Sequence, residues 1–472
     1  MILALLACAP EGPSPIILVS LDTLRADRLG AWGNTRGLTP SLDRFAAEAV
    51  IFPHTYAQAT TTAPSHASLF TSRYPSEQDV EDRRPDTDGM PTLAEVLTTY
   101  GWTTAAFVAG GDLSPELGVG KGFGLWTSVR DFGSLYHTAP AALSWLDEHG
   151  DDGPFLLFVH GYDAHTPYLK PAPFGYAMAD MSWRGPGQDA VHMSTETAID
   201  GWLHPDFGSF ISVMEDEPRP RSAHARARLA EEAASPGRTP ARKLADADLQ
   251  LIRDVYDGGV AYADLQFGLL MVGLAERGWL DRATIVVFSD HGEQLGEDGI
   301  FNHCCGVGDE ESHVVLMVRP PGGVKGRRED GIVELVDVMP TLLELAGATP
   351  PAGIHGRSFA AALRGEAWTG RDVAWTQGGP AMRQLGARTA TGRLIWSGVP
   401  SSSPFAAPML AAASLPGPGF TSDLPAADQD KLRAAMVAFL PTLALPPTRA
   451  ATPLSPALEA ALREHGYWEV GE

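Results

Sequence analysis

Two acids and an imidazole in this sequence could hold a divalent cation. Asp290 and His291 are adjacent and follow an apolar run, and Asp22 follows another apolar run far earlier in the chain. Two carboxylates and one imidazole form a mixed oxygen and nitrogen ligand set that suits a divalent cation. Taken alone, an Asp-His pair after a strand is more often a hydrogen-bonded loop pair than a metal site.

A hydroxyl that could act as a nucleophile stands in the segment 60–74. Pro64 suits the first turn of a helix, which would leave Thr62 just before the helix N-terminus. The N–H groups and dipole at such an end favour an anion, such as a sulfuryl or phosphoryl group. A nearby cation would lower the pKa of the Thr62 hydroxyl and activate it. The ordinary role of a threonine in this place is a helix cap.

A third cluster, 160–168, carries His160 and His165. A histidine at the end of a strand can protonate a leaving group near neutral pH. The alternative is a turn stabilised by Asp163 and Pro167. Each of the three clusters is weak evidence by itself, and their placement at strand ends strengthens them together.

The apolar runs at 16–21, 155–159 and 284–289 predict parallel strands that are covered on both faces. Predicted helices alternate with them, at 141–148, 257–277 and 334–346. The fold class is therefore α/β, with a mostly parallel central sheet flanked by helices. Ligands of such sheets bind beyond the carboxyl ends of the strands. We expect the polar residues that follow the strands to meet at that edge, namely Asp22, His160, Asp290 and His291.

The remaining segments predict three regions. Residues 1–14 form a signal or lipoprotein segment, 15–369 a catalytic domain, and 370–472 a small antiparallel C-terminal subdomain. Within the catalytic domain, the stretch from about 170 to 248 is interpreted as an insertion of loops and one or two helices near the site. In the C-terminal part, 388–396 is predicted to be a hairpin that turns at Thr391-Gly392, and 455–465 a helix.

The charge and the N-terminus bear on partners and location. The formal net charge of −23 argues against binding to nucleic acid or to an anionic membrane. The run Met1–Cys8 resembles the lipobox of bacterial lipoproteins, with Cys8 as the lipidated residue. It is too short to span a bilayer and lacks a basic segment, so either the true start lies upstream or the run is a buried strand edge. The expectation is an exported lipoprotein of the bacterial cell envelope, anchored only through Cys8. The sequence does not indicate an oligomeric state.

As a set, the motifs resemble the sulfatases of the alkaline phosphatase superfamily. The N-terminal signatures lie at 22–30, 39–46 and 62–75. Further motifs follow in family order: His165 with Pro167, then 256–264, 289–293, 336–343, 356–358 and 462–467. The resemblance covers nearly the whole chain, apart from the 170–248 insertion and the stretch 397–450.

The resemblance implies an alkaline phosphatase-like fold and a role for each matching residue. One divalent metal, usually calcium in sulfatases, would be held by Asp22, Thr62, Asp290 and His291. Thr62 takes the nucleophile position, and His66 stands where the signature has arginine. His165, and likewise His303, would contact the transferred group or the leaving oxygen. His313 or Arg319 would supply a further basic residue.

The sequence departs from the family pattern at several positions. Thr62 cannot give the formylglycine that sulfatases make from cysteine or serine, and Ser72 replaces a common glycine. Thr23 replaces a frequent second aspartate, which favours manganese or zinc over calcium. The Lys-x-His element of arylsulfatases is not recognisable between 105 and 123. Threonine nucleophiles occur in related phosphodiesterases and lipoteichoic acid synthases. A second metal, as in the two-zinc phosphodiesterases, would need Asp163, His165 and His303.

The expected function is metal-dependent hydrolysis of an anionic sulfate or phosphate ester, including phosphodiester hydrolysis or phosphoryl transfer through Thr62. The alternative is a catalytically silent relative that binds anionic glycans or lipid head groups. Loss of the formylglycine precursor and of the Lys-x-His element motivates this alternative.

Overall fold

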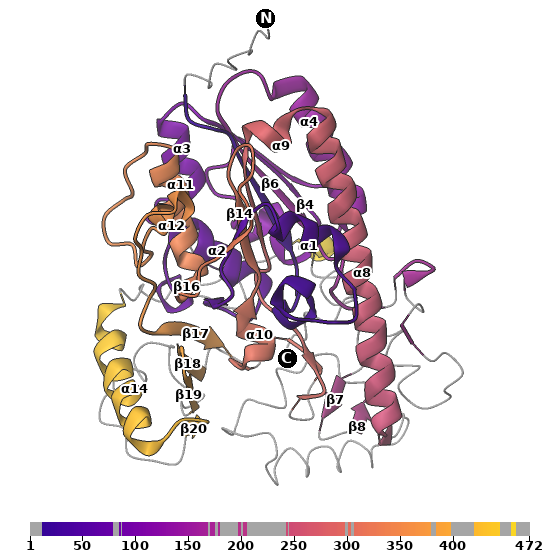
Figure 1. The fold of residues 1–472 in the computed structure, drawn as a ribbon, viewed down its shortest axis with the longest axis vertical. Coiled ribbons are helices and arrows are strands. Elements are labelled where there is room, and N and C mark those ends of the chain that lie inside the picture. Colours follow the sequence, from indigo (N-terminus) through magenta and orange to yellow (C-terminus); the bar gives the residue numbers. More distant parts are fainter. Residues whose placement is uncertain are drawn as a thin grey trace, which may run out of the picture.

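An eight-stranded sheet forms the centre of the molecule in the computed structural model (Figure 1). The structure describes residues 12–78, 85, 87–168, 170–174, 178–179, 197–199, 202–204, 242–243, 245–297, 301–303, 306–378, 384–397, 420–443 and 455–458. The strand order is β15-β2-β14-β10-β1-β6-β4-β5, and β14 alone runs against the other strands of this sheet. In this order the strands are Arg327–Arg328, Val50–Ile51, Leu316–Arg319, Thr284–Phe288, Ile16–Leu21, Phe155–Gly161, Thr103–Val108 and Leu125–Ser128. The predicted α/β class with a mostly parallel sheet is confirmed.

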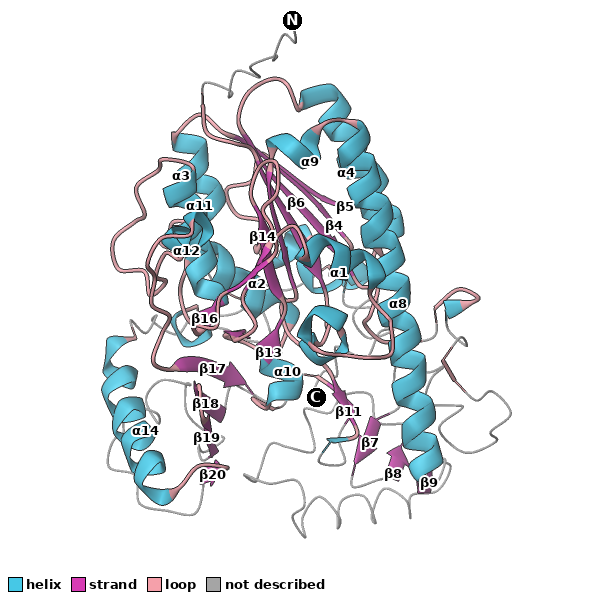
Figure 2. Ribbon diagram, in the orientation of Figure 1, coloured by secondary structure: helices cyan, strands magenta, loops and turns pink. Residues whose placement is uncertain are grey.

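Helices cover both faces of this sheet (Figure 2). On one face lie α1 (Pro40–Ala46), α4 (Leu135–His149), α8 (Asp246–Glu276) and α9 (Trp279–Arg282). On the other lie α2 (Thr62–Thr71), α3 (Leu93–Thr99), α11 (Val338–Leu345) and α12 (Ala360–Arg364). Ile17 and Val19 of β1 pack in the first core, and Ile16 and Leu18 in the second. Two buried faces explain why the strand sequences are continuously apolar.

Two helices begin earlier than predicted, at points where a carboxylate accepts a backbone N–H group. The predicted 141–148 helix begins at Leu135, whose N–H donates to the Asp163 carboxylate at 2.9 Å, so Pro140 lies inside it. The predicted 257–277 helix begins at Asp246, because the Asp248 carboxylate accepts the Ala245 N–H at 2.8 Å. Helix α8 is long and apolar enough to cross a membrane, yet 56% of its most apolar window is buried in the protein.

The predicted 334–346 helix is shorter than expected. Val333–Glu334 form strand β16, Leu335–Asp337 form a 3-10 turn, and α11 begins at Val338. This start places Pro340 in the first helical turn, where its missing N–H costs no intrahelical hydrogen bond.

The C-terminal part contains the predicted small antiparallel sheet, together with a helix that the sequence analysis did not predict. Strands β17 (Ala374–Gly378), β18 (Gln384–Thr389), β19 (Gly392–Ser397) and β20 (Phe420–Ser422) pair in sequence order, and α14 (Ala426–Phe439) packs on them. Thr389 pairs with Gly392, so the hairpin turns at Ala390-Thr391, one residue before the predicted turn.

Several predictions fall mainly on residues outside the described ranges. The Cys8 segment, Cys304, Cys305 and the tail helix beyond 458 belong to this group. Within the predicted insertion, the described residues include three short antiparallel strands, β7 (Thr197–Ile199), β8 (Trp202–His204) and β9 (Arg242–Lys243). The domain boundaries remain predictions.

Candidate active site

The carboxyl edge of the central sheet gathers the predicted site residues. Asp22 follows β1, Asp290 and His291 follow β10, and His160 lies near the end of β6. Because β6, β1 and β10 are consecutive parallel neighbours, their ends bring these residues together. All four side chains are fully buried.

Asp22, Asp290 and His291 form a group that fits one cation. Each offers a ligand atom, and these atoms lie within 4.8 Å of one another; no other such group occurs among the described residues. Oδ1 of Asp22 and Oδ2 of Asp290 accept no hydrogen bond although both are buried. The Nδ1–H of His291 donates to the Gly292 carbonyl at 2.9 Å, so Nε2 remains to face the carboxylates. A cation between the two side chains would satisfy these two buried carboxylate oxygens.

The Thr62 hydroxyl lies at this group. Its Oγ1 is 3.2 Å from Oδ2 of Asp22 and 3.3 Å from Nε2 of His291. Thr62 is the first residue of α2 and Thr61 is the cap residue, so the predicted start of the helix was one residue late. Ser65 of the same helix donates to the Asp290 carbonyl at 2.7 Å, which ties α2 to the loop after β10. Residues far apart in the chain therefore converge on one point, as predicted.

The predicted histidines His165 and His303 lie next to this group. The ring centroid of His303 is 4.5 Å from that of His291 and 5.0 Å from that of His165. The Nδ1 of His303 is 3.1 Å from the Glu293 carboxylate, which fixes the imidazole ring. The Nδ1–H of His165 donates to the Thr166 carbonyl at 2.6 Å. The role of these two imidazoles in protonating a leaving group remains a prediction.

Comparison with known proteins identifies the chain. The model of the family described as Sulfatase matches residues 14–348, more than two thirds of the sequence. The chain belongs to the sulfatase family. It is thereby an ester hydrolase of the class that acts on sulfuric or phosphoric esters. Members of this family use a divalent metal, and the Asp22, Asp290 and His291 group is the matching candidate here.

Individual relatives have low sequence identity to this chain, but the matches extend over most of both chains. The chain is 24% identical to the multifunctional alkaline phosphatase superfamily protein PehA of Trinickia caryophylli, over 73% of this chain and 76% of that protein. It is 25% identical to the N-acetylglucosamine-6-O-sulfatase of Bacteroides thetaiotaomicron, over 76% and 72%. The phosphonate monoester hydrolase structure of Agrobacterium radiobacter superimposes with a TM-score of 0.63 at 19% identity, over 91% of this chain and 95% of that one. This likeness confirms the alkaline phosphatase-like fold. The relatives named as hydrolases give no support to the alternative of a catalytically silent binding protein.

His66 takes the place of the arginine in the sulfatase signature but not its charge. Its side chain is fully buried, with Nε2 2.9 Å from the Ser20 hydroxyl and Nδ1 2.8 Å from the Thr62 carbonyl. Burial lowers the pKa of His66 to about 4, so the ring is neutral. His160 is similar: burial lowers its pKa to about 4, and its Nε2–H donates to Asp22 Oδ2 at 3.2 Å. His66 thus contacts the Thr62 backbone and His160 contacts the Asp22 side chain, and the predicted catalytic role of His66 remains a prediction.

Lys170, which the sequence analysis missed, provides the basic side chain next to the site. Its ammonium donates to the carbonyls of His165 at 2.8 Å and Pro167 at 3.1 Å. Burial lowers the pKa of Lys170 to about 8, against the charges of Asp163 and Asp22. The signal that could have found Lys170 is its place five residues after His165, in a chain with few basic residues.

His313 and Arg319 do not fill the basic role that the resemblance suggested for one of them. The Nε2 of His313 lies 2.6 Å from the Pro53 carbonyl, and burial lowers the pKa of its ring. Arg319 pairs with Ile285 at the start of β10, the opposite edge of the sheet, where it binds Glu48. The Arg319 prediction failed because its distance after the Asp-His pair does not indicate which edge of the sheet it reaches, whereas His313 lies near the site's edge but is bound to the Pro53 carbonyl.

The second metal group suggested for Asp163, His165 and His303 is not assembled. Among the described residues, these three do not bring ligand atoms into one group. The Asp163 carboxylate instead accepts the Leu135 N–H at the start of α4, and burial raises its pKa to about 7. Asp163 thus serves as a helix cap and a neighbour of Lys170.

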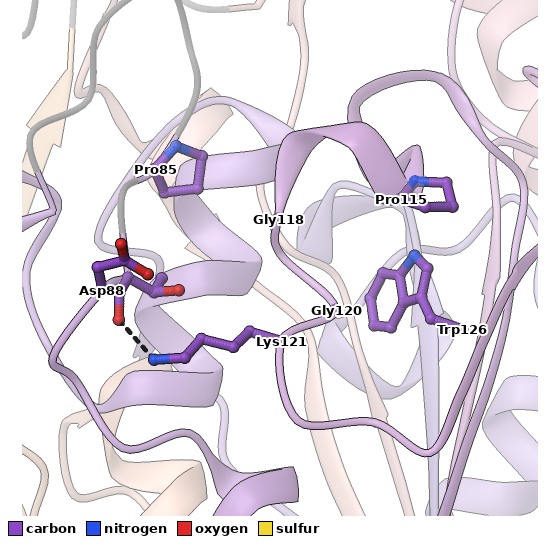
Figure 3. Close-up of a pocket in the computed structure, with 8 residues that line it drawn as sticks. Pro85, Asp88, Pro115, Gly118, Gly120, Lys121 and Trp126 are labelled. Atoms are coloured by element: carbon purple, nitrogen blue, oxygen red, sulfur yellow. Dashed lines mark hydrogen bonds between the residues drawn. The ribbon is translucent and has the colours of Figure 1, made fainter. Parts of the chain in front are cut away.

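A separate cavity of about 410 Å³ lies beside β5. Figure 3 shows it between Pro85, Pro115, Trp126 and Lys121. The Lys121 ammonium donates to the Thr87 and Met90 carbonyls at 3.0 and 3.1 Å and lies 3.6 Å from the Glu95 carboxylate, which offsets its charge. None of the predicted site residues lines it, and the carboxyl edge of the sheet remains the candidate active site.

The cation-free protein should lose stability between pH 4 and pH 6 because of Asp22. Burial raises the pKa of Asp22 from 3.8 to about 6, so the folded chain keeps a proton that the unfolded chain releases. The free energy of unfolding should therefore fall by about 3 kcal/mol as the pH rises through this window. Urea unfolding in EDTA across this range tests it, with Asp22→Asn as the control that should lack the Asp22 contribution. Identical pH profiles for the two proteins would contradict the assignment.

Proposed function

We propose that this member of the sulfatase family hydrolyses an anionic phosphorus ester, with Thr62 as the nucleophile and a divalent cation as the cofactor. The observation that carries the proposal is the position of the Thr62 hydroxyl, 3.2 Å from Asp22 Oδ2 and 3.3 Å from His291 Nε2. Thr61, not Thr62, occupies the cap position of α2. Helix capping therefore does not explain why the Thr62 hydroxyl lies next to Asp22 and His291.

Asp22, Asp290 and His291 would hold the cation. The set contains one nitrogen and two carboxylate ligands and no thiolate, which favours manganese or zinc over calcium. When bound, a divalent cation lowers the pKa of a hydroxyl and stabilises negative charge on the transferred group. The buried carboxylate oxygens that accept no hydrogen bond are consistent with this role.

Four side chains, those of Thr62, Asp22, His165 and His303, carry the bond-forming and proton-transfer steps. Thr62 Oγ1 forms the new bond to phosphorus while the bond to the leaving oxygen breaks in line. The Thr62 hydroxyl already donates toward Asp22, which is the direction in which its proton leaves. His165 or His303 delivers a proton to the leaving oxygen. Water then attacks phosphorus, releases the acid and restores the threonine hydroxyl.

The identity of residue 62 favours phosphorus over sulfur. A sulfated formylglycine hydrate can expel sulfate when its second hydroxyl loses a proton and the aldehyde forms as the C–O bond to sulfate breaks, whereas an ester of threonine must be cleaved by water at the central atom. The named relatives include a phosphonate monoester hydrolase and a multifunctional protein of the superfamily, as well as a glucosamine sulfatase. A sulfate ester is therefore the competing substrate class in the experiment.

A panel of chromogenic esters tests the proposal. The protein is stripped with EDTA and reloaded with manganese, zinc, calcium or magnesium. It is then assayed on 4-nitrophenyl sulfate, 4-nitrophenyl phosphate, bis(4-nitrophenyl) phosphate and a phenylphosphonate monoester. We expect turnover of a phosphorus ester that is highest with manganese or zinc and is absent in EDTA. Turnover of the sulfate alone would overturn the phosphorus assignment, and no turnover of any ester would overturn the function.

A further inference from the structure

Thr23 connects the two acids of the cation group in an unusual conformation. It follows Asp22 directly, and its backbone N–H donates to Asp290 Oδ1 at 3.4 Å. The φ angle of Thr23 is +56°, in the left-handed region that β-branched residues rarely adopt. Such a conformation persists only when the surrounding structure holds it in place. The position of the Asp290 carboxylate therefore depends on contacts that keep Thr23 in this strained state.

Within this turn the Thr23 hydroxyl donates to the Asp22 carbonyl at 2.7 Å, and one hydroxyl group from another element also contacts the turn. The Tyr256 hydroxyl, from the buried face of α8, donates to the Thr23 carbonyl at 2.7 Å and accepts the Arg25 N–H at 3.1 Å. It thus holds the backbone on both sides of Leu24. Tyr256 is completely buried, and burial raises the pKa of its hydroxyl, which stays protonated and able to donate.

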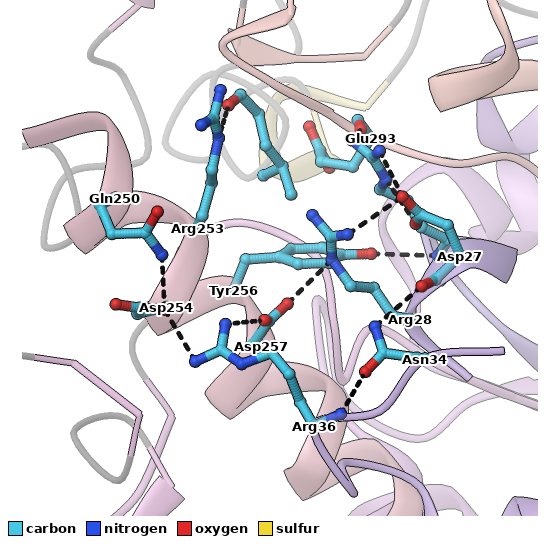
Figure 4. Close-up of polar contacts among 12 residues, drawn as sticks. Asp27, Arg28, Asn34, Arg36, Gln250, Arg253, Asp254, Tyr256, Asp257 and Glu293 are labelled. Carbon is cyan, nitrogen blue, oxygen red and sulfur yellow. Dashed lines mark hydrogen bonds and ion pairs between the residues drawn. The ribbon is translucent and has the colours of Figure 1, made fainter. Parts of the chain in front are cut away.

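Ion pairs around Tyr256 fasten the same segment to α8 (Figure 4). The neighbouring Asp257 binds Arg28 at 2.9 Å and also Arg36. Arg25 donates to the Glu293 carbonyl at 2.9 Å, two residues after the ligand His291. The turn after β1, helix α8 and the loop after β10 are therefore joined at one point, and Tyr256 is the member of this junction that contacts Thr23.

We propose that Tyr256 is a positioning residue of the cation site: its hydroxyl holds Thr23 in the left-handed conformation, so that the Thr23 N–H fixes Asp290. The N–H engages Oδ1 of Asp290 and leaves Oδ2, which accepts no hydrogen bond, toward Asp22 and His291. This inference rests on the proposed cation site and adds a residue more than 30 positions away from any ligand in the chain.

The test is the cation affinity of Tyr256→Phe, with Tyr74→Phe as the matched control. Phenylalanine keeps the ring and removes one hydroxyl. Tyr74 is also buried, and its hydroxyl donates to Glu334 at 2.8 Å, in contact with the C-terminal part of the chain rather than with the cation group. Manganese affinity is measured by calorimetry on EDTA-stripped protein, and thermal unfolding in EDTA reports the stability of each variant.

We expect Tyr256→Phe to weaken manganese binding by about ten- to hundredfold, the usual effect of removing a group that orients a ligand. Tyr74→Phe should lower the unfolding temperature but leave manganese affinity within about twofold. Equal affinity of Tyr256→Phe and the wild type, or equal weakening in both variants, would overturn the inference while leaving the proposed function intact. A wild-type protein that binds no manganese, zinc or calcium would overturn the cation site itself, and the inference with it.

Discussion

Replacement of Thr62 by alanine should reduce turnover by about a thousandfold or more, because it removes the atom that forms the covalent intermediate. The cation ligands Asp22, Asp290 and His291 remain, so manganese affinity should fall far less than turnover does. The measurements are initial rates on the best ester of the panel and calorimetric manganese binding on the same preparation. A fall in both quantities by the same factor would indicate that Thr62 acts only as a ligand.

Thr62→Ser and Thr62→Val are the matched controls. Serine retains the hydroxyl and should retain much of the activity, whereas valine retains the shape of threonine and should be as inactive as alanine. Turnover that is unchanged in the alanine variant would show that the reaction does not pass through residue 62. In that case the hydroxyl is a structural group at the start of α2, and another nucleophile, such as a water, would have to be sought.

The parts of the fold that follow from local sequence were predictable. Continuous apolar runs fixed the strands, and a parallel sheet places strand ends at a single edge, so Asp22, Asp290 and His291 could be brought together without any structure. Pro64 located the start of α2 to within one residue. These inferences succeed because burial on both faces of a sheet leaves a strong and local pattern in the sequence.

Other site residues were not predictable because their roles depend on contacts between distant parts of the chain. Tyr256 is the first residue of the 256–264 motif, but the motif does not indicate that its hydroxyl meets Thr23, 233 positions away. Lys170 lies beside His165 only because its ammonium binds three nearby carbonyls of that loop. Arg319 failed for the opposite reason: it follows the Asp-His motif in sequence, but its strand returns in the antiparallel direction and carries it to the far edge.

Replacement of Asp290 by asparagine should have effects of opposite sign on function and on the stability of the cation-free protein. Burial raises the pKa of Asp290, and the charge of Asp22 raises it further, so the empty site contains two carboxylates that repel each other. Asparagine removes one of these buried charges and should stabilise the cation-free protein at pH 7.5 by about 1–3 kcal/mol. The same change removes a cation ligand, so turnover should fall by about a thousandfold, and manganese affinity should fall as well.

Asp264→Asn is the control for this pair of effects. Asp264 is also buried, but its carboxylate accepts the N–H groups of Ser41 and Leu42 at 3.0 and 2.8 Å at the start of α1. An amide satisfies these donors less well than a carboxylate, so Asp264→Asn should destabilise the protein and leave manganese affinity unchanged. Urea unfolding in EDTA and calorimetry separate the two variants. If Asp290→Asn destabilises the cation-free protein as Asp264→Asn does, then the Asp290 carboxylate is held by hydrogen bonds alone, and the case for a cation between Asp22 and Asp290 fails.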